Sequence, residues 1–350
     1  MAPHHSDLTV DVVICCYTLD RWELLVAAVR SVRAQTRRPG RLVISVDHNR
    51  ALFERCAAEW GAEPVATDGP VPVVVENRYP GRLGSARNTG IEHCTADVVA
   101  FLDDDAAAEP DWLETLLAVY ADRRIYAVGG APRPRYEAPR PAWLPESFNW
   151  VFGCHYEGLP ETLAPVRHLI GANMSVRRAP FVALGGFHAD DHDDQDLSHN
   201  IAHTYGPDAV IYEPKARVNH FVSANRLTWQ YFSRRCFVVN RSKVASVADM
   251  GEAGNIGAEL RFALGVARSL PRALRAAARR DVRPLQHFAV AVTGLGLAGA
   301  GHLVGKVELA LGRRRPQLST GLERPSAAAP DEVTARPAPA RGVEEPAWRT

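Results

Sequence analysis

The sequence predicts an α/β fold: a Rossmann-like, mainly parallel sheet flanked by helices. Three observations support this. Short apolar runs without alternation, at residues 10–16 and 98–102, are typical of strands buried on both faces. The segments between such runs include stretches with the apolar spacing of amphipathic helices. The predicted strands end in polar or acidic residues, at the edge where open α/β sheets bind their ligands.

The first elements form a strand-helix-strand unit. Residues 10–16 are a strand that leads to Tyr17, residues 22–35 carry helical apolar spacing behind an Asp20 cap, and residues 41–46 are a strand that stops at Asp47. Because such a unit joins parallel strands in a right-handed crossover, we expect Tyr17 and Asp47 at one edge of the sheet.

A further strand at residues 71–75 leads into a glycine-punctuated helix start at residues 81–90. Its free N–H groups and arginines suit a phosphate group. Three carboxylates, Asp103, Asp104 and Asp105, follow the strand at residues 98–102. Clustered carboxylates repel one another unless a cation or a set of donors lies among them, which predicts Mg²⁺ or Mn²⁺ holding a diphosphate. The alternative is a solvated acidic turn that caps the next helix.

In this order the segments resemble the family 2 glycosyltransferases with the GT-A fold, over about residues 8–245. The resemblance depends on five motifs: Cys-Cys-Tyr-Thr at 15–18, Ser-Val-Arg-Ala-Gln-Thr at 31–36, Val-Asp-His at 46–48, Gly-Ser-Ala-Arg-Asn-Thr-Gly at 84–90 and Phe-Leu-Asp-Asp-Asp at 101–105. The first motif is most similar to members that act on polyprenyl- or dolichyl-phosphate-linked sugars.

The resemblance implies roles for these residues. Tyr17 would lie against the nucleotide base and Asp47 would hydrogen-bond it. Arg87 and Asn88 would lie near the ribose and phosphates, with Asp104 also assigned to cofactor binding. Asp103 and Asp105 would form the Asp-x-Asp metal motif. His48-Asn49 departs from the family's common Asp-Gly, which leaves the base and the donor sugar open.

The second half of the chain matches the acceptor-domain pattern of the same family at residues 170–176, 184–187 and 193–197. By that pattern Asp194 is the general base that takes the proton of the acceptor hydroxyl, with Asp193 and Asp196 as its neighbours. His220 falls where members often carry a histidine that reaches the diphosphate or metal. The plainer alternatives are an acidic helix start that complements the helix dipole and a structural histidine.

Three other functions each match part of the sequence. A zinc hydrolase would use His199 and His203, but the zincin motif needs Glu where Asn200 stands. A catalytically inactive nucleotide- or carbohydrate-binding module would keep Tyr17 and Asp47 without needing Asp194. Residues 289–299 spell a G-x-G-x-x-G dinucleotide fingerprint, yet the strand and acidic residue that should follow are absent from the sequence.

Residues 284–305 instead predict an apolar helix, uncharged and long enough to cross a bilayer, with arginines on both sides. Peripheral membrane contact and a buried soluble helix are both compatible with it. A net charge of +1 argues against nucleic-acid binding. The polar start of the chain and six scattered cysteines indicate a cytoplasmic protein, at the membrane's cytoplasmic face if the helix touches lipid.

The predicted organisation is therefore a nucleotide-sugar-binding half at residues 1–130, an acceptor half at 131–245, a helical segment at 246–315 and a disordered tail at 316–350. A proline-rich loop is expected at residues 132–145. Residues 230–235 lack the Gln-x-x-Arg-Trp of processive synthases. The predicted activity is inverting, metal-dependent, non-processive transfer of one sugar from a nucleotide diphosphate sugar to a saccharide, lipid-linked or small-molecule hydroxyl.

Overall fold

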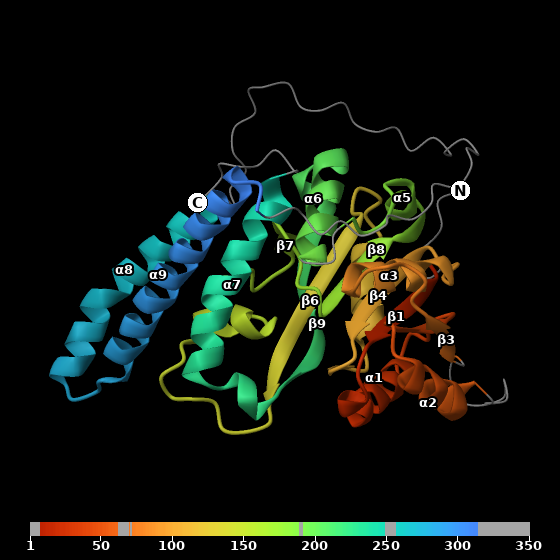
Figure 1. The fold of residues 1–350 in the computed structure, drawn as a ribbon, viewed down its shortest axis with the longest axis horizontal. Helices are drawn as coiled ribbons and strands as arrows, with labels where there is room; N and C mark the ends of the chain where they lie inside the picture. Colours follow the sequence, from red (N-terminus) through yellow and green to blue (C-terminus); the bar gives the residue numbers. More distant parts are fainter. Residues whose placement is uncertain (1–7, 62–69, 71, 189–191, 249–256, 314–350) are drawn as a thin grey trace. The chain divides into compact units, whose positions relative to one another are not determined.

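The computed structural model describes residues 8–61, 70, 72–188, 192–248 and 257–313, which form two compact units (Figure 1). Within these residues the first unit holds 8–132 and 160–219, and the second holds 133–159 and 220–313. The tail that the sequence predicts to be disordered lies outside the described residues.

Four parallel strands form one side of the sheet in the first unit. They are β1 (Val10–Cys16), β2 (Leu42–Val46), β3 (Pro72–Glu76) and β4 (Val98–Asp103), in the order β3-β2-β1-β4. Val12 lies opposite Leu42 on one side and Ala100 on the other. The four strands predicted from apolar runs are therefore confirmed, and their carboxyl ends meet at one edge.

The other strands make the sheet mixed. β8 (Asn173–Arg177) runs antiparallel to β4, and the order continues β8-β6-β9-β5. β6 spans Ala127–Tyr136, β9 spans Val210–Val222, β5 spans Ala106–Ala108, and β7 (Ala164–Pro165) pairs antiparallel with β9. The loop predicted to begin at residue 132 is therefore wrong in its first part. On the β8 side of β6 the prolines Pro132 and Pro134 interrupt no pairing, because β8 pairs only with residues 127–129.

Helices cover both faces of this sheet. α1 (Trp22–Arg33), α2 (Arg50–Trp60) and α4 (Trp112–Val119) pack on the face formed by Val12 and Ile14. α3 (Leu83–Glu92), α5 (Arg178–Ala183) and α6 (Asp193–Tyr205) pack on the face formed by Val13 and Phe101. Alternate residues of one strand thus enter opposite cores, which explains why the strands read as continuous apolar runs.

A close approach positions α3 on the sheet. A Cβ at Gly90 would lie 2.4 Å from Cγ1 of Val13, closer than real Cβ contacts. The glycine therefore lets α3 lie deep against β1, and residues 84–91 of the helix are all buried. This depth brings Arg87 and Asn88 beneath the strand ends rather than onto the surface.

The second unit is mainly helical. α7 (Trp229–Ala248), α8 (Gly257–Ala278) and α9 (Arg283–Ala310) accompany the short helix η2 (Glu146–Phe152). α9 packs on α7 through glycines, since a Cβ at Gly301 would lie 2.2 Å from the carbonyl oxygen of Phe237. The sequence prediction of a helix over 284–305 is confirmed, and the continuous helix excludes a dinucleotide-binding turn there.

Candidate functional site

Tyr17 and Asp47 lie at the carboxyl ends of neighbouring strands, as predicted. Tyr17 is 53% exposed. Asn49 donates to the carbonyl oxygen of Tyr17 at 2.9 Å, and its Oδ1 caps α2 through the N–H of Leu52. These bonds tie the loop after β1 to the start of α2, and they leave an aromatic ring and a carboxylate at one edge.

Asn77, which sequence reasoning missed, orients Asp47. Its Nδ2 donates to Oδ1 of Asp47 at 2.8 Å, while its own Oδ1 accepts from the N–H of Tyr79 and the hydroxyl of Thr89. Asn77 is buried, so its amide has one orientation that satisfies all these bonds. Its position two residues after the strand predicted at 71–75 was the signal available in the sequence.

His48 occupies the left-handed region, with φ of 47°. A residue with a side chain is disfavoured there, typically by 1–2 kcal/mol. Its Nε2 lies 2.9 Å from the carbonyl oxygen of Tyr79, a contact that holds the imidazole beside Asp47. Asn49, which stands where the family commonly has glycine, has an extended backbone with φ of −127°, so this turn needs no glycine there.

One carboxylate oxygen of Asp103 lies within 4.8 Å of one carboxylate oxygen of Asp105. The Asp103 side chain is 29% exposed, and that of Asp105 is 4% exposed. Two carboxylates at this separation suit a hard divalent cation. Arg21, which the sequence analysis did not select, is a neighbouring cation: its Nη1 lies 3.1 Å from Oδ2 of Asp105. Its guanidinium also lies over the ring of Tyr17, 5.3 Å from the centroid.

Asp104, predicted to bind the cofactor, has a different environment. Its Oδ1 accepts from Nη1 of Arg21 at 2.8 Å, and the residue is only 3% exposed. Its Oδ2 is buried without a hydrogen-bond partner among the described residues. Burial raises the pKa of Asp104 to about 7, against the lowering effect of Arg21. The side chain turns into the protein and binds Arg21, and the assignment of Asp104 to cofactor binding stays a prediction.

Arg87 is also buried, with its side chain 2% exposed. Its guanidinium pairs with Asp193 and, at 3.0 Å, with Oδ1 of Asp103, and it donates to the carbonyl oxygen of Gly171 at 2.9 Å. Burial alone would lower the pKa of Arg87, but the two carboxylates hold it above its usual range. Its donors thus face protein acceptors rather than an open phosphate site.

Asn88 is fully buried and bonded to one backbone segment. Its Nδ2 donates to the carbonyl oxygen of Phe187 at 2.8 Å, and its Oδ1 accepts from the N–H of the same residue at 2.9 Å. The amide ties α3 to the segment that precedes α6, because the deep packing of α3 turns this side chain inward. The contact of Asn88 with ribose or phosphate stays a prediction.

Among the three acidic residues in the first turn of α6, Asp194 differs from its neighbours. Asp193 and Asp196 are buried, whereas Asp194 is partly exposed. The carboxylate of Asp194 accepts from the N–H of Gly171 at 3.2 Å and of Gln195 at 2.8 Å. The Asp193 carboxyl pairs with Arg87, and its burial raises its pKa to about 7. Asp194 is therefore the accessible, oriented carboxylate of this helix start.

Asp196 has a structural environment. Its Oδ2 accepts from the N–H of His188 at 2.9 Å, and its Oδ1 accepts from Nδ2 of Asn200 at 2.9 Å. The zinc alternative has no matching cluster, because among the described residues no group of three metal-binding side chains includes His199 or His203.

His220 lies on β9 in the second unit and is buried. Its Nδ1 lies 3.3 Å from Sγ of Cys154, a residue of the same unit. The prediction that His220 ligates a metal stays a prediction.

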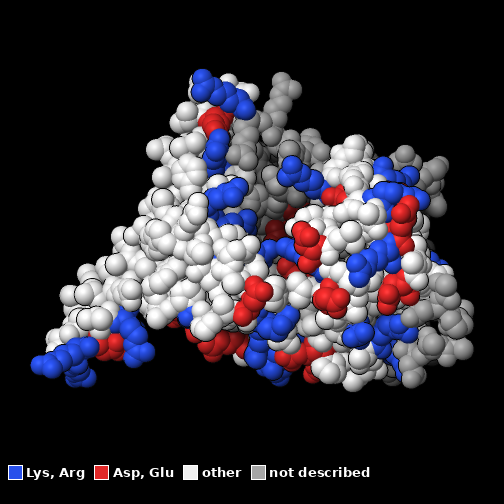
Figure 2. All heavy atoms as spheres, turned by 60° about the horizontal axis from the view of Figure 1, so that its bottom comes forward, with Lys and Arg blue, Asp and Glu red and all other residues white. Residues whose placement is uncertain are grey.

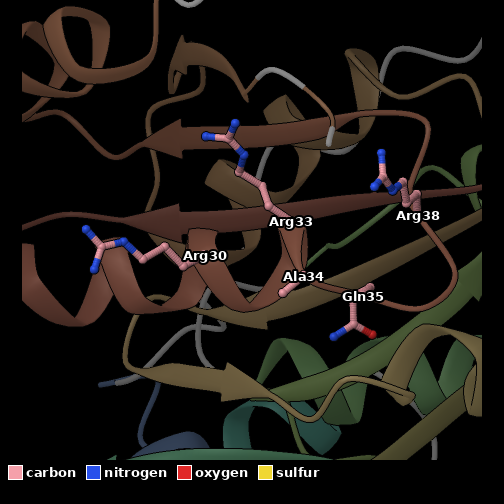
Figure 3. Close-up of a pocket in the computed structure, with 5 residues that line it drawn as sticks. All are labelled: Arg30, Arg33, Ala34, Gln35 and Arg38. Atoms are coloured by element: carbon pink, nitrogen blue, oxygen red, sulfur yellow. The ribbon is translucent and has the colours of Figure 1, made fainter. Parts of the chain in front are cut away.

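A shallow hollow of about 380 Å³ lies at the carboxyl end of α1 (Figure 3). Arg30, Arg33, Ala34, Gln35 and Arg38 line it. The amide of Gln35 is satisfied by backbone groups of Ser31, Glu109 and Leu113. Because α1 returns antiparallel to the strands, this end belongs to the edge opposite the strand ends. The hollow is therefore separate from the candidate site.

Comparison with known proteins identifies the family. A model described as glycosyl transferase family 2 matches residues 11–185. A glucosyl-dolichyl phosphate glucuronosyltransferase of Haloferax volcanii is 36% identical over 67% of this chain and 76% of its own length. A pre-mycofactocin glycosyltransferase of Mycobacterium tuberculosis is 30% identical over 62% of this chain and 43% of its own length.

A solved mannosyltransferase from Pyrobaculum calidifontis, in complex with GDP-Man and Mn²⁺, has a similar fold. Its TM-score is 0.54 at 18% identity, over 85% of this chain and 89% of its own. The mixed sheet with polar residues at its strand ends and the matches to known proteins point to the same family. The chain therefore belongs to glycosyl transferase family 2, and it is a glycosyltransferase with a GT-A-like fold.

Proposed function

We propose that this glycosyltransferase moves one sugar from a nucleoside-diphosphate sugar to an acceptor hydroxyl, with inversion and with a divalent cation. The observation that carries the proposal is the joint occurrence, in one unit, of the carboxylate pair Asp103–Asp105 and the accessible carboxylate Asp194. A single displacement needs both a counter-charge for the leaving diphosphate and a base for the acceptor.

Tyr17 and Asp47 are the proposed nucleotide contacts. The half-exposed ring offers a stacking face, and Asn77 presents the Asp47 carboxylate at the same edge. Asp103 and Asp105 would hold Mg²⁺ or Mn²⁺, which supplies positive charge to the diphosphate. The similar mannosyltransferase was solved with GDP-Man and Mn²⁺, which agrees with this ligand class. A contribution of His220 to the metal rests on the sequence resemblance.

Asp194 is the proposed base. In the displacement, the acceptor oxygen forms a bond to the anomeric carbon while the bond from that carbon to the diphosphate oxygen breaks, and the acceptor proton passes to Asp194. The two backbone N–H groups that bind its carboxylate fix its direction before the acceptor arrives. In this proposal residues 1–130 mainly bind the donor and residues 131–245 contribute the acceptor side.

A lipid-linked saccharide is the proposed acceptor, because the Haloferax relative is named for a dolichyl phosphate substrate. Among the described residues α9 is the one helix long and apolar enough to cross a membrane. Its face with Gly301 and Gly305 packs on α7, while Val292, Leu303 and Val307 are exposed on the other face. Figure 2 shows a broad uncharged surface over this helical unit, with Lys and Arg gathered at its ends.

Such a surface fits peripheral contact with anionic lipid headgroups, and we place the enzyme at the cytoplasmic face of a membrane. A spanning α9 would draw α7, on which it packs, into the bilayer, and α7 carries Arg234, Arg235 and Arg241, whose charges are costly in lipid.

The test is a panel of UDP-, GDP- and dTDP-sugars, measured by thermal shift with and without Mn²⁺. A true donor raises the Tm by mass action, more with the cation than without it. The stabilising donors are then assayed for transfer to a polyprenyl-phosphate-linked glucose and to a water-soluble glucoside. Transfer only to the soluble glucoside would reject the lipid-linked acceptor. No metal-dependent stabilisation by any donor would reject the proposed donor site.

A further inference from the structure

Arg87 is the centre of a closed set of contacts that includes the proposed base. Its guanidinium pairs with Asp193, the residue before Asp194. It also donates to the carbonyl oxygen of Gly171, whose N–H in turn donates to Oδ2 of Asp194. The ring is completed within α6, where Oδ1 of Asp193 accepts from the N–H of Asp194 at 3.0 Å.

The same guanidinium reaches the proposed cation site. Its Nη2 lies 3.0 Å from Oδ1 of Asp103 at the end of β4. Asp103 and Asp193 are far apart in sequence and belong to different elements, a strand end and a helix start. One buried side chain therefore spans the distance between the carboxylate assigned to the metal and the helix that carries the base.

We propose that Arg87 is a positioning residue that sets the place of the Asp194 carboxylate relative to Asp103. It acts through two routes, the Asp193 carboxylate and the Gly171 peptide, and this role rests on the proposed function of Asp194 as the base. The role differs from the phosphate contact that the resemblance implies, because the guanidinium already contacts two carboxylates and a carbonyl in a buried setting.

The chemistry of arginine suits this task. A guanidinium presents five donors in a rigid planar fork, so it can bind three acceptors at fixed angles, whereas an ammonium is a compact point charge. Phe101 and Phe187 flank the group, each with its ring centroid 5.8 Å from the guanidinium carbon. This packing restricts the guanidinium of Arg87, so the groups hydrogen-bonded to it are restricted in turn.

The test compares Arg87→Lys and Arg87→Met with the parent chain. Lysine keeps the buried charge but cannot bridge all three acceptors. We expect turnover to fall by about tenfold or more for Arg87→Lys and about 10² for Arg87→Met, the usual effect of misplacing a catalytic group by about 1 Å. Binding of UDP or GDP without metal, measured by calorimetry, should change less than about threefold, since Tyr17 and Asp47 are untouched.

A second arm separates positioning from a general effect on folding. In an Asp194→Asn background the base is already absent, so Arg87→Lys should cost less than about threefold. A purely structural role would cost the same factor in both backgrounds, and that result would overturn the inference. Arg124→Met is the matched control, because Arg124 is an exposed arginine that pairs with Asp122; we expect no change in turnover.

A crystal structure of Arg87→Lys provides a readout that needs no substrate. The inference requires the Asp194 carboxylate to leave the N–H of Gly171 or to move relative to Asp103. An unchanged Asp194 would overturn the inference, whatever the activity. A fully active Asp194→Asn would instead reject the proposed base, so the two failures are distinguishable.

Discussion

Replacing Asp194 by Asn tests the base directly, because Asn keeps the shape of the side chain but accepts no proton. A positioned base contributes about 10²–10⁴ to the rate, so transfer should fall by that factor, or about 2.7–5.4 kcal/mol in the barrier. The affinity for the donor should stay the same, since Tyr17, Asp47 and the Asp103–Asp105 pair are unchanged. The assay is single-turnover transfer at saturating donor, with calorimetric binding of the nucleoside diphosphate beside it.

The loss of folding stability caused by Asp194→Asn follows from the contacts of the Asp194 carboxylate. Its two oxygens accept from two backbone N–H groups, those of Gly171 and Gln195. An amide offers one oxygen, and its NH₂ would face the other N–H, so one charge-assisted bond is lost at about 1–2 kcal/mol. This amount lowers the Tm by a few degrees but leaves the protein folded at the assay temperature.

Asp196→Asn is the matched comparison. It also disturbs two hydrogen bonds that a carboxylate in the first turn of α6 accepts. The Asp196 carboxylate is buried, however, and its two donors are the N–H of His188 and the side-chain amide of Asn200. We expect a similar loss of stability with little loss of transfer. If Asp196→Asn or Asp193→Asn is inactive and Asp194→Asn is near normal, the base has been assigned to the wrong residue. If all three variants are active, the single-displacement mechanism must be abandoned.

Three further predictions concern the cation, the nucleotide and the membrane. Asp105→Ala should abolish turnover and most of the Mn²⁺-dependent part of nucleotide affinity, measured by calorimetry with and without EDTA. Tyr17→Ala and Asp47→Ala should each weaken binding of the nucleoside diphosphate alone, by about 1–3 kcal/mol for the stacking contact by analogy with single-stranded nucleic acids. Leu303→Asp with Val307→Asp should reduce sedimentation with anionic vesicles at low salt, because both side chains are more than half exposed on α9.

Each of these has a decisive contrary result. Full activity in excess chelator would remove the cation from the mechanism. If Tyr17→Ala and Asp47→Ala both bind UDP, GDP and dTDP as the parent does, the pocket for the nucleobase lies elsewhere. Equal vesicle binding by the α9 variant and the parent would make the helix an ordinary soluble element. Point variants are preferred to deleting α9, since Val290 and Ala291 of that helix are buried in the core of the second unit.

The sequence predicted the parallel strands and the edge at which they end. Apolar runs indicate burial on both faces, and the strand-helix-strand order dictates that parallel strands end together. The sequence alone therefore assigns Tyr17, Asp47 and Asp103 to one edge. The apolar helix over 284–305 was predicted on similar grounds, because its length and lack of charge are local properties of the chain.

The contacts of the charged side chains at that edge were decided only by the tertiary structure. Asp104, Arg87 and Asn88 look equally suited to a ligand in the sequence, yet the structure turns Asp104 onto Arg21 and ties Asn88 to the backbone of Phe187. Arg87 pairs with Asp193, which lies 106 residues further along the chain. Local periodicity specifies which face of an element is buried, but a buried polar group must find its partner in three dimensions, and that partner can lie anywhere along the chain.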